Sequence, residues 1–536
     1  MKKLLKTILI ILISCQLISC NKDKDYVQMI PADADFVIQV NPKTIAEKGE
    51  LKNFDQFEVG KITLQNLDNA EPKLKELVLQ ILENPTDFGI DLISPLYIFG
   101  KKQNNKTISS LVMKMNDKGD FEKQLKIILQ KDVDFETING YTFVKGSRKP
   151  FIAWNKTQFY FLAGEYGTSS KQLETFFNQI IENKHALTEN NSFKDFLKNT
   201  QDINIWYTGE FVKYYTKNQV KSAHDLDFST SSWSTYLSFN KDNISFTQKF
   251  HPDPATKVKI KEHPMWKSKI NTDFYKYFPG RSYLNFSFAV HPANTRYIFN
   301  NENPITEFLD NYEIDKNLIA ESFDGELLFN IYDFEVAKDF NLNEYFGQHK
   351  NFEKNQIIPQ FVLAGRMKNK AFYDHLITSL GQSVKPEGEY YAMRINSNLH
   401  LYFAYKYNLL YVTNNQIQMK NFIFNRVEKL NFVQSKFSTR AKNSMFGYAN
   451  LDYSQYPPEI QNYLIKQLPF PYTKDIDNIL NQFTDIQFNV TDEYTKSGTL
   501  NFKKGDKNTL YRVLTSIDQL YVLFTSNVYS TTDESN

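Results

Sequence analysis

The segment Ile108-Ser-Ser-Leu-Val-Met-Lys-Met115 has the short, mostly apolar pattern of a strand, and a similar segment occurs about 250 residues later. That second segment is Gln360-Phe-Val-Leu-Ala-Gly-Arg-Met367, and each is followed by apolar residues at helical spacing. These are Phe121, Leu125, Ile128 and Leu129 after the first segment, and Phe372, Leu376, Ile377 and Leu380 after the second. Residues 108–250 and 360–502 align throughout at an offset near 240–252, which predicts an internal duplication.

The rest of each copy extends this match. A second apolar stripe at helical spacing comprises Leu173, Phe176, Phe177, Ile180 and Ile181 in one copy and Ile423, Phe424, Val427 and Leu430 in the other. Both copies end on a predicted hairpin, at 236–250 and 486–502, and open on a predicted strand within 31–40 and 279–288. The order predicts an α+β fold of two tandem related repeats, each a mixed or antiparallel sheet with helices packed on one face. Two unrelated α+β domains remain the alternative.

We expect the following organisation. Residues 1–19 form a lipoprotein signal peptide, 20–28 a lipidated cysteine and tether, 29–256 the first repeat, 257–278 a crossover, 279–505 the second repeat, 506–525 a C-terminal amphipathic helix, and 526–536 a disordered tail. A length of 536 residues fits several structural units, since one unit typically has about 150 residues.

The N-terminus predicts the location. Lys2, Lys3 and Lys6 precede an apolar run of 12 residues, 7–18, which is shorter than the roughly 20 residues of a membrane span and fits a secretory signal. The run ends in Leu17-Ile18-Ser19-Cys20, which resembles the lipobox of bacterial lipoproteins. The resemblance implies that Cys20 receives a diacylglycerol, that the chain is cut before it, and that its new amino group is acylated, for example with palmitate. An ordinary signal peptide with a chance cysteine is the alternative.

Charge and cysteine content exclude several classes of protein. Without residues 1–19 the chain has 517 residues, with 60 basic and 61 acidic side chains, so its formal charge is −1. We therefore expect no nucleic-acid partner, because such partners require a basic face. The sequence Asn21-Lys-Asp-Lys-Asp25 resembles the export signals of surface lipoproteins of the Bacteroidetes, and the residue after Cys20 is not aspartate. We expect the outer membrane, on either its periplasmic or its surface side.

Motifs for chemistry are largely missing. The eight histidines form no zinc-protease pair, and the sequence has no dinucleotide, phosphate-loop or nucleophile-elbow motif. His224-Asp-Leu-Asp227 fits a polar loop better than a metal site. We predict no catalytic residue, no metal ligand and no cofactor. A glycosidase needs only two suitably spaced carboxylates, and 61 acidic residues leave that possibility open.

Tryptophans provide the candidate binding residues. All four lie in the first half of the chain, and the second copy has Gly447 at the place of Trp206. Two related halves with different aromatic residues can divide labour, one binding and one supporting. Trp154, Trp206 and Trp233 are therefore predicted ligand-binding residues for a sugar or a peptide, with packing in the core as the alternative.

The opening Tyr26-Val-Gln-Met-Ile-Pro-Ala-Asp-Ala-Asp-Phe-Val-Ile-Gln-Val-Asn41, followed by Ala46-Glu-Lys-Gly-Glu-Leu51, resembles a family. With the lipobox and the short tether, it is similar to Bacteroidetes lipoproteins that carry a large domain of unknown function, DUF 4836-like. The resemblance covers nearly all of the chain after the signal peptide. It implies a shared location and fold and supplies no catalytic residues.

These observations predict a non-catalytic, lipid-anchored cell-envelope protein that binds or organises another envelope component, either a protein or a glycan. The lipid on Cys20 would be its contact with the membrane. A carboxylate-dependent envelope hydrolase that acts on glycan is the alternative. Because two matching halves can replace a homodimer, we expect a monomer.

Overall fold

The computed structural model describes residues 25–70, 72–103, 106–129, 133–144, 151–182, 185–215, 227–267, 269–295, 310, 314–338, 355–396, 398–468 and 473–530. The chain divides into two compact units. Unit 1 comprises Met1–Val220, Asp227–Asp253 and Lys504–Asn536, and unit 2 comprises Lys221–Leu226 and Pro254–Lys503. The C-terminal segment therefore returns to unit 1.

An antiparallel sheet forms the centre of unit 1. Its strand order is β4 (Phe135–Ile138), β5 (Tyr141–Val144), β6 (Phe151–Trp154), β7 (Gln158–Gly164), β3 (Lys106–Lys114), β2 (Leu96–Gln103), β1 (Phe36–Val40), β8 (Ile203–Thr208), β9 (Ser232–Phe239) and β10 (Asn243–His251). The helices are α2 (Pro42–Gly49), α3 (Glu58–Ala70), α4 (Pro72–Glu83), α5 (Lys118–Leu129), α6 (Ser170–Glu182), α7 (Asn191–Leu197), α8 (Gly209–Tyr215) and α18 (Thr509–Ser530). Short 3₁₀ helices are η1 (Asp25–Met29), η2 (Leu51–Gln56), η3 (Pro85–Phe88) and η4 (Leu187–Glu189).

Unit 2 is built on a sheet with the same strand order. The order is β14 (Val384–Glu387), β15 (Tyr390–Arg394), β16 (His400–Lys406), β17 (Leu409–Thr413), β13 (Asn355–Met367), β12 (Phe323–Lys338), β11 (Leu284–Ala289), β18 (Met445–Asn450), β19 (Phe483–Val490) and β20 (Thr495–Phe502), again antiparallel. Its helices are α9 (Pro254–Glu262), α12 (Lys316–Ser322), α14 (Ala371–Leu380), α15 (Gln416–Ile423), α16 (Pro458–Lys466) and α17 (Lys474–Leu480). Its 3₁₀ helices are η6 (Thr272–Tyr277), η7 (Pro292–Asn294), η8 (Gly381–Ser383), η9 (Phe432–Gln434), η10 (Arg440–Lys442) and η11 (Tyr453–Gln455).

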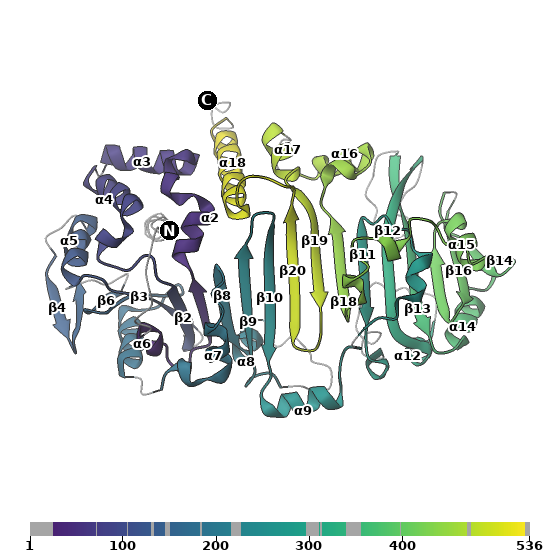
Figure 1. Cartoon of the computed structure of the whole chain (residues 1–536), viewed down its shortest axis with the longest axis horizontal. Helices are drawn as coiled ribbons and strands as arrows, with labels where there is room; N and C mark the ends of the chain where they lie inside the picture. Colours follow the sequence, from purple (N-terminus) through teal and green to yellow (C-terminus); the bar gives the residue numbers. More distant parts are fainter. Residues whose placement is uncertain are drawn as a thin grey trace. The chain divides into compact units, whose positions relative to one another are not determined.

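The predicted α+β class with a large antiparallel sheet is confirmed, but helices cover both faces of each sheet. On β2, Leu96 belongs to the core with α4 and α5, whereas its neighbour Tyr97 belongs to the core with α6 and α7. Successive side chains of a strand point to opposite faces, so a strand with apolar residues at both parities must be covered twice. Figure 1 shows α3 and α4 on one side of the unit 1 strands and α6 on the other. The prediction of helices on one face is wrong for this reason.

Several predicted boundaries differ from those in the structure. Tyr26 and Val27 are buried in unit 1, so the folded body includes part of the predicted tether 20–28. The predicted crossover 257–278 contains η6, whose Phe274 and Tyr275 lie in the core of unit 2. These residues are apolar and aromatic, which explains why they fold into a core instead of acting as connectors.

The end of the chain differs as well. Helix α18 continues to Ser530, beyond the predicted end at 525, and its Leu510 is buried in the core of unit 1. The predicted signal peptide, 1–19, and Cys20 lie outside the described residues, as do 531–536. Within the described ranges, no helix has both the length and the apolar character that a membrane span requires.

Candidate functional site

Two of the three predicted tryptophans lie in the core of unit 1. Trp154 is fully buried and its indole Nε1 donates a hydrogen bond to Glu122 Oε1 at 2.9 Å. Trp206 is 2% exposed and its Nε1 donates to Ser192 Oγ at 3.0 Å. Both indole groups are satisfied within the protein, so neither can contact a ligand at the surface, and the packing alternative describes them.

The sequence pattern aligns Gly447 of the second copy with Trp206 of the first, but in the structure a different residue corresponds to Trp206. Trp206 packs its ring against Phe193, with ring centroids 5.7 Å apart. In unit 2 the residue beside Gly447, Tyr448, makes the corresponding contact with Phe437 at 3.9 Å. A tyrosine therefore takes the place of Trp206, and Gly447 lies on the other face of β18.

Trp233 is different, because it is half-buried and stands in a row of aromatic residues across four adjacent strands. In the sheet register, Phe36 on β1 is opposite Tyr207 on β8, Tyr207 is opposite Trp233 on β9, and Trp233 is opposite Phe250 on β10. We call Phe36, Tyr207, Trp233 and Phe250 the aromatic row. All four side chains are partly exposed.

Three rings of the row, those of Tyr207, Trp233 and Phe250, stack on one another. Tyr207 and Trp233 are 5.8 Å apart with an interplanar angle of 11°, and Trp233 and Phe250 are 4.7 Å apart at 26°. Phe211 of α8 contacts Phe36 at 5.2 Å and Tyr207 at 6.2 Å, while Phe228 contacts Trp233 at 6.0 Å and Phe250 at 5.6 Å. The row is thus a continuous aromatic surface held at both ends by further rings.

A glycine makes room for the first ring of the row. Gly100 on β2 is opposite Phe36, and a Cβ at this position would lie 2.6 Å from ring atoms of Phe36. Real Cβ atoms do not approach a ring so closely, so the ring of Phe36 lies over β2 because residue 100 has no side chain.

The corresponding positions of unit 2 carry no ring. By the same sheet register, Leu284 on β11 is opposite Ala449, Ala449 is opposite Ile486 on β19, and Ile486 is opposite Leu500. This aliphatic row occupies the place in its sheet that the aromatic row occupies in unit 1. The two sheets share a strand order and differ in the chemistry of this surface.

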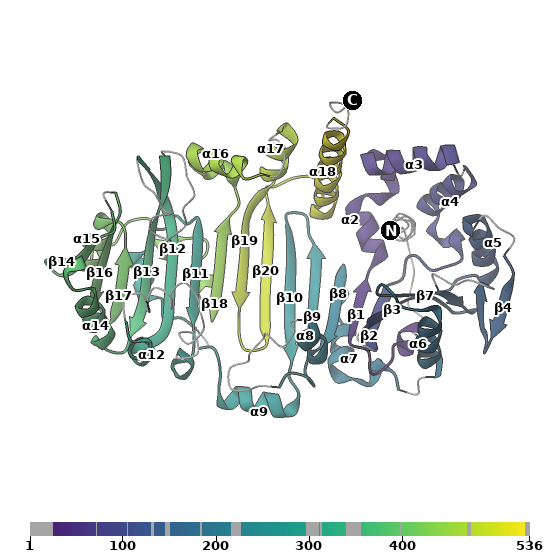
Figure 2. The same ribbon diagram turned by 180° about the vertical axis from the view of Figure 1, so that it is seen from behind.

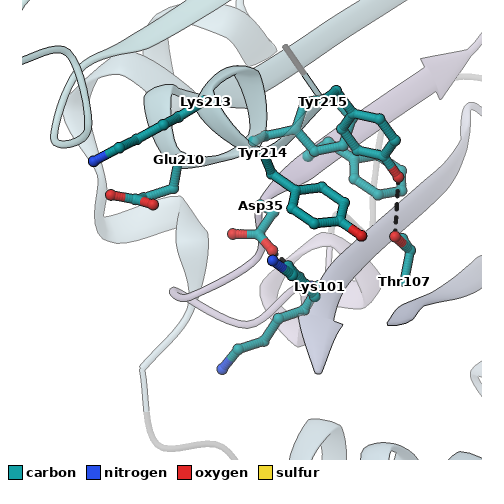
Figure 3. A pocket seen from close by; sticks show the side chains of 10 residues that line it. Asp35, Lys101, Thr107, Glu210, Lys213, Tyr214 and Tyr215 are labelled. Carbon is teal, nitrogen blue, oxygen red and sulfur yellow. Dashed lines mark hydrogen bonds between the residues drawn. The ribbon is translucent and has the colours of Figure 1, made fainter. Parts of the chain in front are cut away.

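A pocket of about 620 Å³ adjoins the Phe36 end of the row (Figure 3). It is lined by Asp35, Phe36, Lys101, Lys102, Thr107, Glu210, Phe211, Lys213, Tyr214 and Tyr215, which come from the start of β1, from β2 and β3, and from α8. Figure 3 shows the side chains of Asp35, Tyr214 and Tyr215 together on one wall. The lining combines aromatic rings with charges of both signs.

Asp35 is the partly buried carboxylate of this pocket. Burial raises its pKa, and the neighbouring Asp33 and Glu210 carboxylates raise it further. Two effects act in the opposite direction, namely the hydrogen bond that the backbone N–H of Lys102 donates to Asp35 Oδ2 at 2.7 Å and the charge of Lys101. Because the direction of the shift is upward, the protonated form of this side chain is more accessible than in an exposed aspartate.

The two tyrosines of α8 contact residues of β2 and β3 that line the same pocket. The ammonium group of Lys102 lies 3.5 Å from the centroid of the Tyr214 ring, a cation–π contact. The hydroxyl of Tyr215 forms a hydrogen bond with Thr107 Oγ1 at 2.9 Å, and Lys101 pairs with Asp33. The pocket can therefore offer ring faces, hydroxyl groups, ammonium groups and carboxylates to one ligand, which suits a sugar or a peptide with several polar groups.

In the described part of the chain, no group of three His, Cys, Asp or Glu side chains lies close enough together to hold a metal ion. His224 and Asp225 lie outside the described residues, as does Cys20.

Comparison with known proteins places the chain in a family. The model of one family, described as "Domain of unknown function (DUF4836)", matches residues 26–510. The chain belongs to DUF4836. No curated protein matches it. Among solved structures, crystal form I of TP0453 matches at 10% identity with a TM-score of 0.25, covering 45% of this chain and 85% of that one.

In this DUF4836 protein, Trp233 stays a predicted binding residue, and the sequence pattern did not identify the other rings of the row or the pocket beside it. The segment Gly209-Glu-Phe-Val-Lys-Tyr-Tyr215, which forms α8, supplies five of the residues that line the pocket. Its signal was two consecutive tyrosines beside charged residues directly after a predicted strand, an arrangement that favours an exposed aromatic surface.

Proposed function

We propose that this DUF4836 protein is a non-catalytic, lipid-anchored cell-envelope protein that binds another envelope component, a protein or a glycan, through the aromatic row and the pocket of unit 1. One observation carries the proposal. The row of partly exposed rings in unit 1 corresponds to aliphatic side chains in unit 2, although the two sheets have the same strand order. Unit 2 covers the corresponding surface with aliphatic side chains, whereas rings offer flat faces on which a sugar or a peptide can stack.

The location belongs to the proposal. The lysine-rich start, the short apolar run and Leu17-Ile18-Ser19-Cys20 support lipid attachment at Cys20. Asn21, in place of an aspartate, supports the outer membrane, and the likeness of 21–25 to export signals supports a bacterium of the Bacteroidetes. Two units with the same strand order support a single copy as the active form. Metabolic labelling with a fatty-acid analogue tests the anchor: the wild-type chain should be labelled and Cys20→Ala should not. An unlabelled wild-type chain would contradict the proposed location.

Calorimetric titration of the mature chain tests binding. The probes are soluble oligosaccharides and stem peptides released from envelope peptidoglycan, which present sugar faces and mixed charges. We expect Trp233→Ala to weaken binding at least tenfold, because a stacked ring at the centre of an interface contributes most of its free energy. Ile486→Ala, at the corresponding place in unit 2, is the matched control and should bind as wild type. Equal affinity of Trp233→Ala and wild type would exclude the row.

The hydrolase alternative rests on Asp35. Its raised pKa fits a general acid, and Glu210 is a second carboxylate in the same pocket. If this alternative holds, the wild-type chain releases reducing ends from envelope glycan, and Asp35→Asn lowers that rate by at least a hundredfold. An absence of any release by the wild-type chain leaves the binding function alone.

A further inference from the structure

The N-terminal half of helix α18 packs against unit 1, and its C-terminal half extends beyond these contacts. Its N-terminal half is attached to unit 1 through Thr509, whose N–H and hydroxyl bond to Asn240 O, and through Leu510 in the core. Leu514 packs within 3.0 Å of the place where a Cβ of Gly49 on α2 would stand, and Asp518 accepts hydrogen bonds from the first backbone N–H groups of α3. The helix then continues for another twelve residues, about 18 Å at 1.5 Å per residue. Figure 2 shows α18 extending away from the strands of unit 1.

The outer half of α18 exposes apolar side chains. Ile517 is 56% exposed, Tyr521 42% and Val522 38%. Ile517 and Tyr521 continue, at helical spacing, the same stripe that Leu510 and Leu514 bury closer to the sheet. A stripe that is buried at one end of a helix and exposed at the other indicates a partner for the exposed part.

The N-terminus limits what that partner is. The hydroxyl of Tyr26 donates a hydrogen bond to Pro95 O at 2.5 Å, and Pro95 directly precedes β2. The first residue of β2, Leu96, is opposite Val40, the last residue of β1, after which the chain enters α2. Helix α18 packs against α2. The N-terminal segment and α18 therefore lie at the same end of strands β1 and β2, with Tyr26 in the core on the α6 face of the sheet and Leu510 in the core on the opposite face.

The distance from Tyr26 to the proposed lipid is short. Six peptide units separate Cys20 from Tyr26, so a fully extended chain spans at most about 20 Å. A membrane that holds the acyl chains of Cys20 must then lie close to the end of unit 1 from which α18 extends. This argument rests on the proposed lipid anchor.

We propose that the outer half of α18, residues 517–525, docks on the surface of the membrane in which the lipid of Cys20 is inserted. The exposed stripe enters the boundary between headgroups and acyl chains, as the apolar face of an interfacial helix does. Anchor and helix then hold unit 1 at two points, which limits its rotation about the tether.

The lack of charged side chains in this part of α18 indicates how it would bind a membrane. No Asp, Glu, Lys or Arg occurs between Asp518 and Asp533, so the polar side of this half-helix is uncharged. Attraction to anionic lipids therefore contributes little, and apolar insertion is the main term. Binding should depend on Ile517 and Tyr521 and should be nearly independent of salt and of anionic lipid.

The experiment uses the mature chain with Cys20→Ala, so that any membrane binding is independent of lipidation. It is sedimented with vesicles of zwitterionic phosphatidylethanolamine and phosphatidylcholine, with and without 30% anionic phosphatidylglycerol, at low and high salt. We expect binding in all four conditions within a factor of two. The additional change Ile517→Glu with Tyr521→Glu should weaken it at least tenfold. Ile62→Glu, at an isoleucine of α3 that is 39% exposed, should leave it unchanged.

Other outcomes overturn the docking proposal. They are no vesicle binding by the Cys20→Ala chain, equal binding by the double glutamate variant, or a concentration-dependent dimer that the glutamates dissolve, which would assign the stripe to a second copy. Circular dichroism melting of each variant shows whether it folds, and Tyr521→Ser replaces the double variant if that one unfolds. Labelling of Cys20 in the wild-type chain is a separate readout, so failure of the anchor and failure of the helix are distinguishable.

Discussion

The carboxylate of Asp518 accepts a hydrogen bond from the backbone N–H of Glu58 at 2.8 Å, which joins the C-terminal helix to the first turn of α3. The other carboxylate oxygen accepts from the N–H of Val59 at 2.9 Å. A residue 460 positions away in the sequence thus acts as the N-terminal cap of α3, and its negative charge lies at the positive end of the helix dipole.

Removing this cap should destabilise unit 1. We expect Asp518→Ala to lower the free energy of unfolding by about 1–2 kcal/mol, because two helix N–H groups lose their acceptor. Urea denaturation measures the change. Asp506→Ala, an exposed carboxylate just before α18, is the control and should change stability by less than about 0.5 kcal/mol. Equal midpoints for both variants would show that the cap contributes nothing.

A second prediction concerns the place of Phe36. Gly100→Ala puts a Cβ where ring atoms of Phe36 lie 2.6 Å away, so the ring must move off β2. We expect a loss of about 1–3 kcal/mol in stability, as for other overpacked sites, and weaker binding at the pocket that Phe36 lines. Gly140→Ala, where nothing lies within 4 Å, is a control for glycine replacement, although its positive φ adds local strain. Wild-type stability of Gly100→Ala would refute the close approach.

Much of the fold was predictable because it depends on patterns within single segments. Residues 108–114 of the first predicted strand lie in β3 and residues 360–367 of the second lie in β13, and these two strands occupy the same place in their sheets. Their following helices, α5 and α14, also lie where helical spacing predicted them. Whether the two units descend from a duplication stays a prediction, since a common strand order does not establish ancestry.

One predicted helix was wrong because apolar residues at helical spacing continue in the sequence beyond the residue at which the helix ends. The stripe through Ile423, Val427 and Leu430 predicted one helix, but α15 ends at Ile423, and Leu430 is 75% exposed. Asn425 has a φ of 53°, a left-handed conformation that asparagine tolerates and that a helix cannot continue through. Short strands such as β4 and β6, with four residues each, were missed because four residues carry too little periodicity.

The site was hard to predict for a different reason. The four rings of the aromatic row come from segments up to about 200 residues apart, and each is one apolar residue in an ordinary strand pattern. Only the register of β1, β8, β9 and β10 places them side by side. Neighbouring residues of a strand, such as Trp206 and Tyr207, point to opposite faces of the sheet. The sequence pattern favoured Trp206 as a binding residue because it is a tryptophan, whereas in the structure Tyr207 lies on the face of the aromatic row.

A third prediction follows from His251 at the end of β10. Burial lowers its pKa, the charge of Lys249 lowers it further, and Asp195 acts in the opposite direction. The unfolded chain therefore binds a proton at a higher pH than the folded chain, and stability is lost as the pH falls below about 6.5. We expect His251→Gln to reduce the slope of stability against pH between 7.5 and 5. Parallel slopes for variant and wild type, measured by urea denaturation, would contradict the shift.

The last prediction concerns Asp35, which affects both the stability of unit 1 and the proposed binding at its pocket. Because the pKa of Asp35 is raised by burial, its charged form is less favourable in the folded chain than in the unfolded chain. The sign is opposite to that of a paired carboxylate: Asp35 opposes folding at neutral pH, and this effect disappears as the pH falls below the unfolded pKa of about 3.9. Asp35→Asn should therefore raise the midpoint of thermal unfolding at pH 7, since the amide oxygen can still accept from the N–H of Lys102.

The same change should weaken binding at the pocket, because the carboxylate is lost from its lining. Asp33→Asn is the matched control: Asp33 is 65% exposed in an ion pair with Lys101, and such surface pairs contribute about 0–1 kcal/mol. A variant at residue 35 that is more stable and binds less well would show that this carboxylate is kept for the ligand at the expense of the fold. A variant that is less stable at pH 7 than wild type would show that Asp35 supports the fold, and its place in the site would lose this support.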